Sequence, residues 1–108
     1  CITFSELCDF KNNIFIFSGA YGSDIFSLIS QNQFSLAEET VENYLKYFGD
    51  NFNFEIQNIN NQGEKDVADF IFSVSSHKGI PVVATNDVLF LKKSDYEAHD
   101  AKVCINRY

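Results

Sequence analysis

Three short segments of the chain have the pattern of β-strands. Residues 14–17 (IFIF) and residues 80–84 (IPVVA) are apolar throughout, which is typical of strands that are buried on both faces. Residues 52–56 (FNFEI) alternate apolar and polar side chains, as a strand with one buried face does. Pro81 lies near the start of its strand, where a missing backbone donor disturbs the sheet least.

Apolar residues three and four positions apart predict two helices between the first and second strands. Ser23 is placed to cap a short helix, whose apolar side carries Ile25, Leu28 and Ile29. Ser35 and Glu38 have the spacing of a capping box. The helix that they open is expected to run to Phe48, with Gly49 as its C-terminal cap.

Two further helices are predicted on either side of the third strand. Residues 64–78 carry apolar side chains at helical spacing, with basic residues in the last turn and Gly79 directly behind them. Ser94 and Glu97 form a second capping-box pattern, which opens a helix through about residue 105.

The order of these elements is β, α, α, β, α, β, α, which predicts the α/β fold class. Strands that alternate with helices form parallel sheets through right-handed crossovers, so we expect about three parallel strands with flanking helices. Residues 1–13 lack a clear period and predict no element. Residues 1–108 are interpreted as one unit without an internal boundary. The chain lacks an initiator Met and ends within an apolar pattern, so we expect it to be a segment of something longer.

Composition and charge narrow the classes of function. The chain has 108 residues, of which eight are basic and fifteen acidic, giving a net charge of −7. A chain this acidic lacks the cationic face that binds a phosphate backbone, so we expect no direct DNA binding. Apolar runs of only four or five residues predict no membrane span. Cys1, Cys8 and Cys104 lack metal-site spacing and are interpreted as reduced thiols of a cytoplasmic protein.

Candidate chemistry gathers where the predicted strands end, because ligands of parallel α/β folds bind at the carboxyl ends of the strands. Ser18 and Gly19 follow the first strand, and Glu55 and Gln57 lie at the end of the second. Glu55 alternates with apolar neighbours. Its carboxylate therefore either faces solvent on the polar side of the sheet or binds a ligand.

Asp87 is the sharpest candidate, because it is an ionisable residue directly behind the third strand, next to polar Asn86. One interpretation is a metal-ligand or acid–base carboxylate. The other is an Asp that satisfies backbone N–H groups in a turn or a helix cap. His77 is expected at the surface of a helix end, and His99 is either a structural histidine or a metal ligand.

A longer stretch of sequence carries a resemblance to a known family. Residues 79–91 (GIPVVATNDVLFL), followed by DYEAHD and AKVCI up to residue 105, resemble the end of a PHP (polymerase and histidinol phosphatase) domain. The domain in question is that of the bacterial replicative DNA polymerase III alpha subunit. Upstream, residues 16–19 (IFSG), 48–50 (FGD) and 54–57 (FEIQ) match the family in the same order.

The resemblance implies a fold and a parent protein. The fold is a (β/α)7-type distorted barrel, of which this chain is the C-terminal part. The parent is a DNA-directed DNA polymerase of chromosome replication, whose Mg-dependent active site lies outside these residues. The segment itself is then inactive, and its expected partners are the proofreading exonuclease subunit and other replicase subunits.

The resemblance also implies the state of the metal site. Intact members hold Zn or Mn with His, Asp, Glu and Cys ligands, and Asp87 matches one of the Asp ligands. Leu89 and Ile59, however, stand where the intact pattern has His. Alkyl side chains donate no electron pair to a metal, so we expect a vestigial, metal-free site. Its rim would comprise Ser18, Gly19, Glu55, Gln57, Asn86 and Leu89.

Two other functions stay open at this point. The chain could belong to a metal-dependent phosphoesterase or 3′–5′ exonuclease PHP domain, or it could be a free-standing α/β domain that binds an unknown ligand. Part of a barrel leaves sheet edges and apolar faces uncovered. For this reason we also expect the isolated segment to self-associate.

Overall fold

The computed structural model describes residues 2–59 and 62–106 and shows an α/β fold. Its sheet has three strands in the order β1-β2-β3, and both neighbouring pairs are parallel. The predicted three-stranded parallel sheet with flanking helices is therefore confirmed. The elements are α1 (Phe4–Asp9), β1 (Ile16–Phe17), α2 (Asp24–Ser30), α3 (Phe34–Phe48), η1 (Gly49–Asn51), β2 (Phe52–Ile56), α4 (Glu64–Lys78), β3 (Val82–Ala84), η2 (Lys93–Asp95) and α5 (Tyr96–Asn106).

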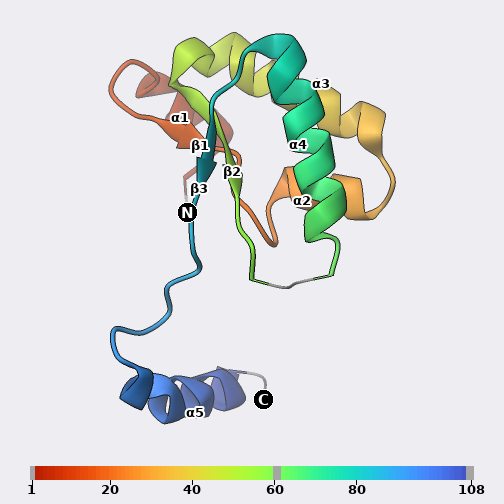
Figure 1. The fold of residues 1–108 in the computed structure, drawn as a ribbon. Coiled ribbons are helices and arrows are strands. Elements are labelled where there is room, and N and C mark those ends of the chain that lie inside the picture. Colours follow the sequence, from red (N-terminus) through yellow and green to blue (C-terminus); the bar gives the residue numbers. More distant parts are fainter. Residues whose placement is uncertain (1, 60–61, 107–108) are drawn as a thin grey trace.

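One face of the sheet is covered by helices. Figure 1 shows α2, α3 and α4 gathered on the same side of the strands; α3 and α4 contact the sheet, and α2 packs on both of them. Phe52 and Phe54 of β2 point into this layer and are only 1% and 0% exposed. The other buried apolar residues of the core are Ile25, Phe26, Ile29, Ala37, Val41, Phe48, Val67, Ile71, Val74 and Ile80.

The opposite face of the sheet is open, which corrects one expectation. The first and third strands were expected to be buried on both faces. Phe15 before β1 is 70% exposed, and Phe17 and Val83 are also exposed. The register places Phe17 beside Asn53, and Glu55 beside Val83, so this face mixes apolar and polar side chains. We call it the open face.

Three of the predicted helix ends are confirmed. The hydroxyl of Ser23 accepts a hydrogen bond from the Phe26 N–H at 3.2 Å and caps α2. Gly49 ends α3 and Gly79 ends α4, each with a positive φ. These signals are local, so the chain carries them wherever the helix packs.

Both predicted capping boxes are wrong. Helix α3 begins at Phe34 after Gln33, so that Ser35 lies inside the helix and caps nothing. Before α5, the carboxylate of Asp95 accepts the Lys92 N–H at 3.1 Å, and η2 occupies the position expected for the Ser94 cap. The Ser94 hydroxyl itself donates to the Asp95 carboxylate at 3.2 Å.

Helix α1 is an element that the sequence interpretation missed. Thr3 caps it by accepting the Glu6 N–H at 3.3 Å, and the Glu6 carboxylate accepts the Thr3 N–H at 2.8 Å. This reciprocal pair is a capping box. Its spacing was visible in the sequence, so the helix could have been predicted.

Residues 86–106 leave the body of the molecule (Figure 1), and we call them the C-terminal arm. Figure 1 shows α5 well separated from the sheet and from the other labelled helices. Several apolar side chains of the arm face solvent, with Leu91 as much as 94% exposed and Val88 and Ile105 also exposed. Among residues 2–59 and 62–106, none of the helices combines the length and apolar character needed to cross a bilayer.

Candidate functional site

The parallel strands bring their carboxyl ends to one edge of the sheet, as predicted. Four polar side chains meet there in a hydrogen-bonded group, which we call the rim cluster. Its members are Ser18, Glu55, Gln57 and Thr85. Three of the four were named from the sequence, and the structure brings those three together.

Ser18 links the first strand to the second. It is buried, its hydroxyl oxygen accepts the Glu55 N–H at 2.9 Å, and its own N–H donates to the Asn53 carbonyl at 2.9 Å. The hydroxyl proton is directed to the Gly19 carbonyl at 3.2 Å. Both polar groups of Ser18 are therefore satisfied within the protein, which is how a buried hydroxyl is stabilised.

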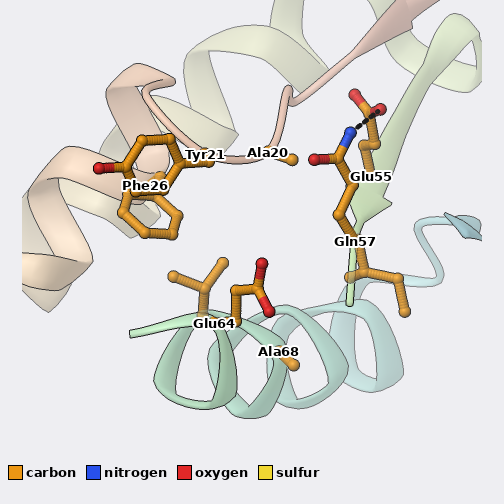
Figure 2. A pocket seen from close by; sticks show the side chains of 9 residues that line it. Ala20, Tyr21, Phe26, Glu55, Gln57, Glu64 and Ala68 are labelled. Atoms are coloured by element: carbon orange, nitrogen blue, oxygen red, sulfur yellow. Dashed lines mark hydrogen bonds between the residues drawn. The ribbon is translucent and has the colours of Figure 1, made fainter. Parts of the chain in front are cut away.

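Thr85 closes the rim cluster from the third strand. Its hydroxyl donates to Glu55 Oε1 at 2.5 Å, and Gln57 Nε2 donates to Thr85 Oγ1 at 3.1 Å and to Glu55 Oε1 at 3.5 Å. Figure 2 shows Gln57 and Glu55 pointing toward each other. Thr85 was missed as a site residue, although it lies two positions after Val83, which pairs with Glu55, and side chains alternate along a strand.

Gly19 shapes the turn that follows Ser18. Its φ is +71°, and a Cβ built on it would lie 2.9 Å from the Cβ of Ser23. Any larger residue would therefore combine an unfavourable backbone conformation with a clash. The glycine lets the chain turn tightly from β1 into the residue that caps α2.

Asp87, Asn86 and Leu89 do not belong to the rim cluster. All three are exposed on the C-terminal arm. Within residues 2–59 and 62–106, the Asp87 carboxylate makes no hydrogen bond or ion pair, and the nearby Val88 N–H donates to the Asn86 carbonyl at 3.0 Å. The turn-stabilising interpretation of Asp87 has no hydrogen bond in the described residues, and the interpretation as a metal ligand stays a prediction.

The described residues do not fit a PHP-type metal centre by themselves. In residues 2–59 and 62–106 there is no group of three or more His, Cys, Asp or Glu side chains that could hold a metal ion. Glu55 is engaged by Thr85 and Gln57. Among the histidines, exposed His77 lies 2.8 Å from the Ser73 carbonyl through Nδ1, and the His99 ring lies 5.6 Å from that of Phe90.

A small pocket lies beside the rim cluster. Figure 2 shows Glu55, Gln57 and Glu64 around it, with Tyr21 on the far side. The volume open to the centre of a water molecule is about 20 Å³, which is room for about one water. Glu64 also accepts the Ile59 N–H at 3.2 Å. The pocket is too small for a nucleotide, and its polar groups join secondary-structure elements to one another.

Neither of the two cysteines within the described residues belongs to the rim cluster. Cys8 is half-buried beside the core, Cys104 is exposed on α5, and both are free thiols. Cys1 lies outside the described residues. The rim cluster therefore has neither a thiol nor a histidine, and its hydroxyl and carboxylate groups are held by one another.

The chain is similar in sequence to several known proteins, and the three described below have the same name. No family model matches the chain. A Xylella fastidiosa protein named DNA polymerase III subunit alpha is 36% identical over 97 residues, which are 90% of this chain and 8% of that protein. The protein of the same name from Rickettsia bellii is 34% identical over 105 residues, 97% of this chain and 9% of its own length. The one from Escherichia coli K12 is 28% identical over 100 residues.

The resemblance found in the sequence is confirmed by these relatives. The chain spans 8% to 9% of the length of the three relatives described above. Over about nine-tenths of its residues, this chain is similar in sequence to a short stretch of bacterial DNA polymerase III alpha subunits.

Proposed function

We propose that the chain is a segment of a bacterial replicative DNA polymerase, the alpha subunit of DNA polymerase III. The observation that carries this proposal is the similarity over 90% or more of the chain to proteins of that name. The parent would be a DNA-directed DNA polymerase of the cytoplasm that acts in chromosome replication, and the segment would contribute structure to it.

Within the parent, we assign the segment to the C-terminal part of a PHP barrel. The helices cover one face of the parallel sheet, as helices do in α/β barrels. The open face, with exposed Phe15 and Phe17, then faces the barrel interior and is covered by the remaining strands. An exposed apolar surface of this kind marks an interface.

The segment serves as a scaffold in this proposal. The side chains of the rim cluster satisfy one another, and the net charge of −7 disfavours contact with a DNA backbone. The partners are the proofreading exonuclease subunit and other replicase subunits. Isolated from its parent, the segment would self-associate to cover its open face.

The PHP metal site is degenerate in this proposal. Leu89 and Ile59 replace imidazoles of the intact pattern, and Asp87 is left on the exposed arm. No Zn or Mn would be held, whereas the parent would use Mg at its polymerase site. The competing function, a metal-dependent phosphoesterase or 3′–5′ exonuclease, requires a bound transition metal.

Two measurements on the full-length parent test the proposal. Primer extension tests the polymerase assignment, and we expect template-directed synthesis by the parent and none by the 108-residue segment. A parent that fails to extend a primer would contradict the assignment.

Metal analysis of the purified parent tests the scaffold role separately. We expect less than about one-tenth of an equivalent of Zn or Mn, unchanged by Asp87→Ala, because a single carboxylate does not retain a transition metal. Asp69→Ala, which removes an exposed carboxylate from α4, is the control. One equivalent of metal that Asp87→Ala removes and Asp69→Ala retains would favour the phosphoesterase.

A further inference from the structure

A groove on the helical side of the molecule is separate from the rim cluster. It lies where α1, the start of α2 and the middle of α3 meet. Its lining residues are Phe4, Asp24, Thr40, Asn43, Tyr44 and Tyr47. About 360 Å³ of the groove is open to the centre of a water molecule, so it has room for a whole side chain. We call it the aromatic groove.

Three rings form the wall of the aromatic groove. The Phe4 ring lies 5.8 Å from that of Tyr44 and 5.3 Å from that of Tyr47, both in edge-to-face geometry. Tyr44 is fixed from behind by parallel stacking on Phe52 at 5.3 Å. Phe4 and Tyr47 remain exposed. The wall therefore presents aromatic rings to solvent, and ring faces carry the negative part of the aromatic quadrupole.

A carboxylate completes the aromatic groove. Asp24 Oδ1 accepts the Ile25 N–H at 2.8 Å, and Oδ2 accepts the Tyr44 hydroxyl at 2.8 Å. A carboxylate accepts about four hydrogen bonds, so each oxygen of Asp24 keeps an unused acceptor direction. Within residues 2–59 and 62–106 no lysine, arginine or histidine pairs with Asp24. Its charge is therefore held by neutral donors in the first turn of α2, with no basic side chain beside it in the described residues.

Tyr44 remains neutral beside this charge. Burial, the hydrogen bond to Asp24 and the charge of Asp24 together raise the pKa of Tyr44 to about 12. The phenol consequently remains a donor to Asp24 at physiological pH. The aromatic groove thus carries one negative charge beside electron-rich ring faces, and none of its lining residues is basic.

We infer that the aromatic groove binds an arginine side chain from the surface of a partner protein. A guanidinium ion can stack on an aromatic face while its N–H groups donate to a carboxylate. An anion would be repelled by Asp24, and an aliphatic side chain would bury that carboxylate without a partner. The Tyr47 ring already attracts a cation within the chain, since Lys46 Nζ, which does not line the groove, lies 5.7 Å from its centre.

Titration of the isotope-labelled chain with N-acetylarginine amide, followed by NMR, tests this inference. N-acetylcitrulline amide has the same shape without the charge and serves as the control probe. We expect shifts at the amides of Asp24, Asn43 and Tyr47, and binding about fivefold tighter for arginine than for citrulline. Equal affinity for the two probes, or shifts confined to other residues, would overturn the inference.

Two matched pairs of variants locate the site. Asp24→Asn keeps the acceptor for the Ile25 N–H but removes the charge, and should weaken arginine binding about threefold to fivefold. Asp69→Asn makes the same charge change on α4 and should leave the affinity unchanged. Tyr47→Leu should weaken binding about threefold, while Phe72→Leu, at another exposed aromatic residue, should not. If both members of either pair behave alike, the groove is not the site.

Discussion

The two faces of the sheet come from the same three strands but differ sharply in how they are used. On the helix-covered face, Phe52 and Phe54 of β2 are almost completely buried. On the open face, Asn53 and Glu55 of the same strand lie between exposed Phe17 and Val83. An apolar strand sequence therefore allows burial on both faces, but the elements that pack on the sheet determine which face is buried.

The sharpest test of this contrast is a pair of large-to-small substitutions. Phe54→Ala removes a fully buried ring and should lower the free energy of unfolding by about 3–5 kcal/mol. Phe15→Ala removes an exposed ring from the open face and, at concentrations low enough to keep the segment monomeric, should change it by less than about 0.5 kcal/mol. Urea unfolding followed by circular dichroism measures both. Equal losses would show that the two faces are equally buried in solution.

The turn behind β1 should respond almost as strongly. Gly19→Ala forces a positive φ on a residue with a side chain and brings its Cβ against Ser23, so we expect a loss of about 2–3 kcal/mol. Gly22→Ala also has a positive φ but meets no atom within 4 Å, and should cost only about 1–2 kcal/mol. The difference between the two unfolding midpoints measures the effect of the clash with Ser23. If Gly22→Ala costs as much as Gly19→Ala, the close approach to Ser23 is unimportant.

The rim cluster contributes less than the core. Ser18→Ala leaves the Glu55 N–H without its acceptor and should cost about 1–2 kcal/mol, because an unsatisfied buried donor is unfavourable. Ser76→Ala, at an exposed position of α4, should be nearly neutral. The same unfolding assay compares them. A neutral Ser18→Ala would mean that the bond between the strands is dispensable.

The last effect concerns pH and the ring stacked on Phe52. The folded-state pKa of Tyr44 is raised from 10.0 to about 12. Its contribution to stability is therefore complete below pH 10 and is lost as the pH rises through about 12. We expect the unfolding free energy to fall between pH 10 and 12, and to fall less in Tyr44→Phe. Parallel pH profiles for the two proteins would contradict the assigned role of Tyr44.

Elements whose signals are local were predictable from the sequence. Residues 52–56 and 64–78 are β2 and α4 with the expected bounds, and Ser23, Gly49 and Gly79 end their helices as expected. The parallel pairing followed from the order of the elements. The two wrong capping boxes show the limit, since α3 begins before Ser35 without a side-chain cap and the Ser94 hydroxyl donates to Asp95 instead of capping α5.

The candidate site was predictable only in part. Ser18, Glu55 and Gln57 meet because parallel strands end at one edge, which the element order already implied. Asp87 was the strongest candidate from its position after the third strand, yet it lies exposed beyond the rim cluster, whereas Thr85 takes part in it. The direction that a chain takes after a strand depends on which elements pack on the residues that follow the strand. The C-terminal arm has few such contacts with the body.

In the proposed parent, the open face is an interface with the rest of the polymerase subunit. Phe17→Cys places a thiol on that face, and its alkylation rate can be followed by mass spectrometry in the full-length protein, native and urea-unfolded. We predict alkylation at least about tenfold slower in the native full-length protein, because the barrel interior excludes the reagent. A native rate equal to that of the unfolded protein would contradict the claim.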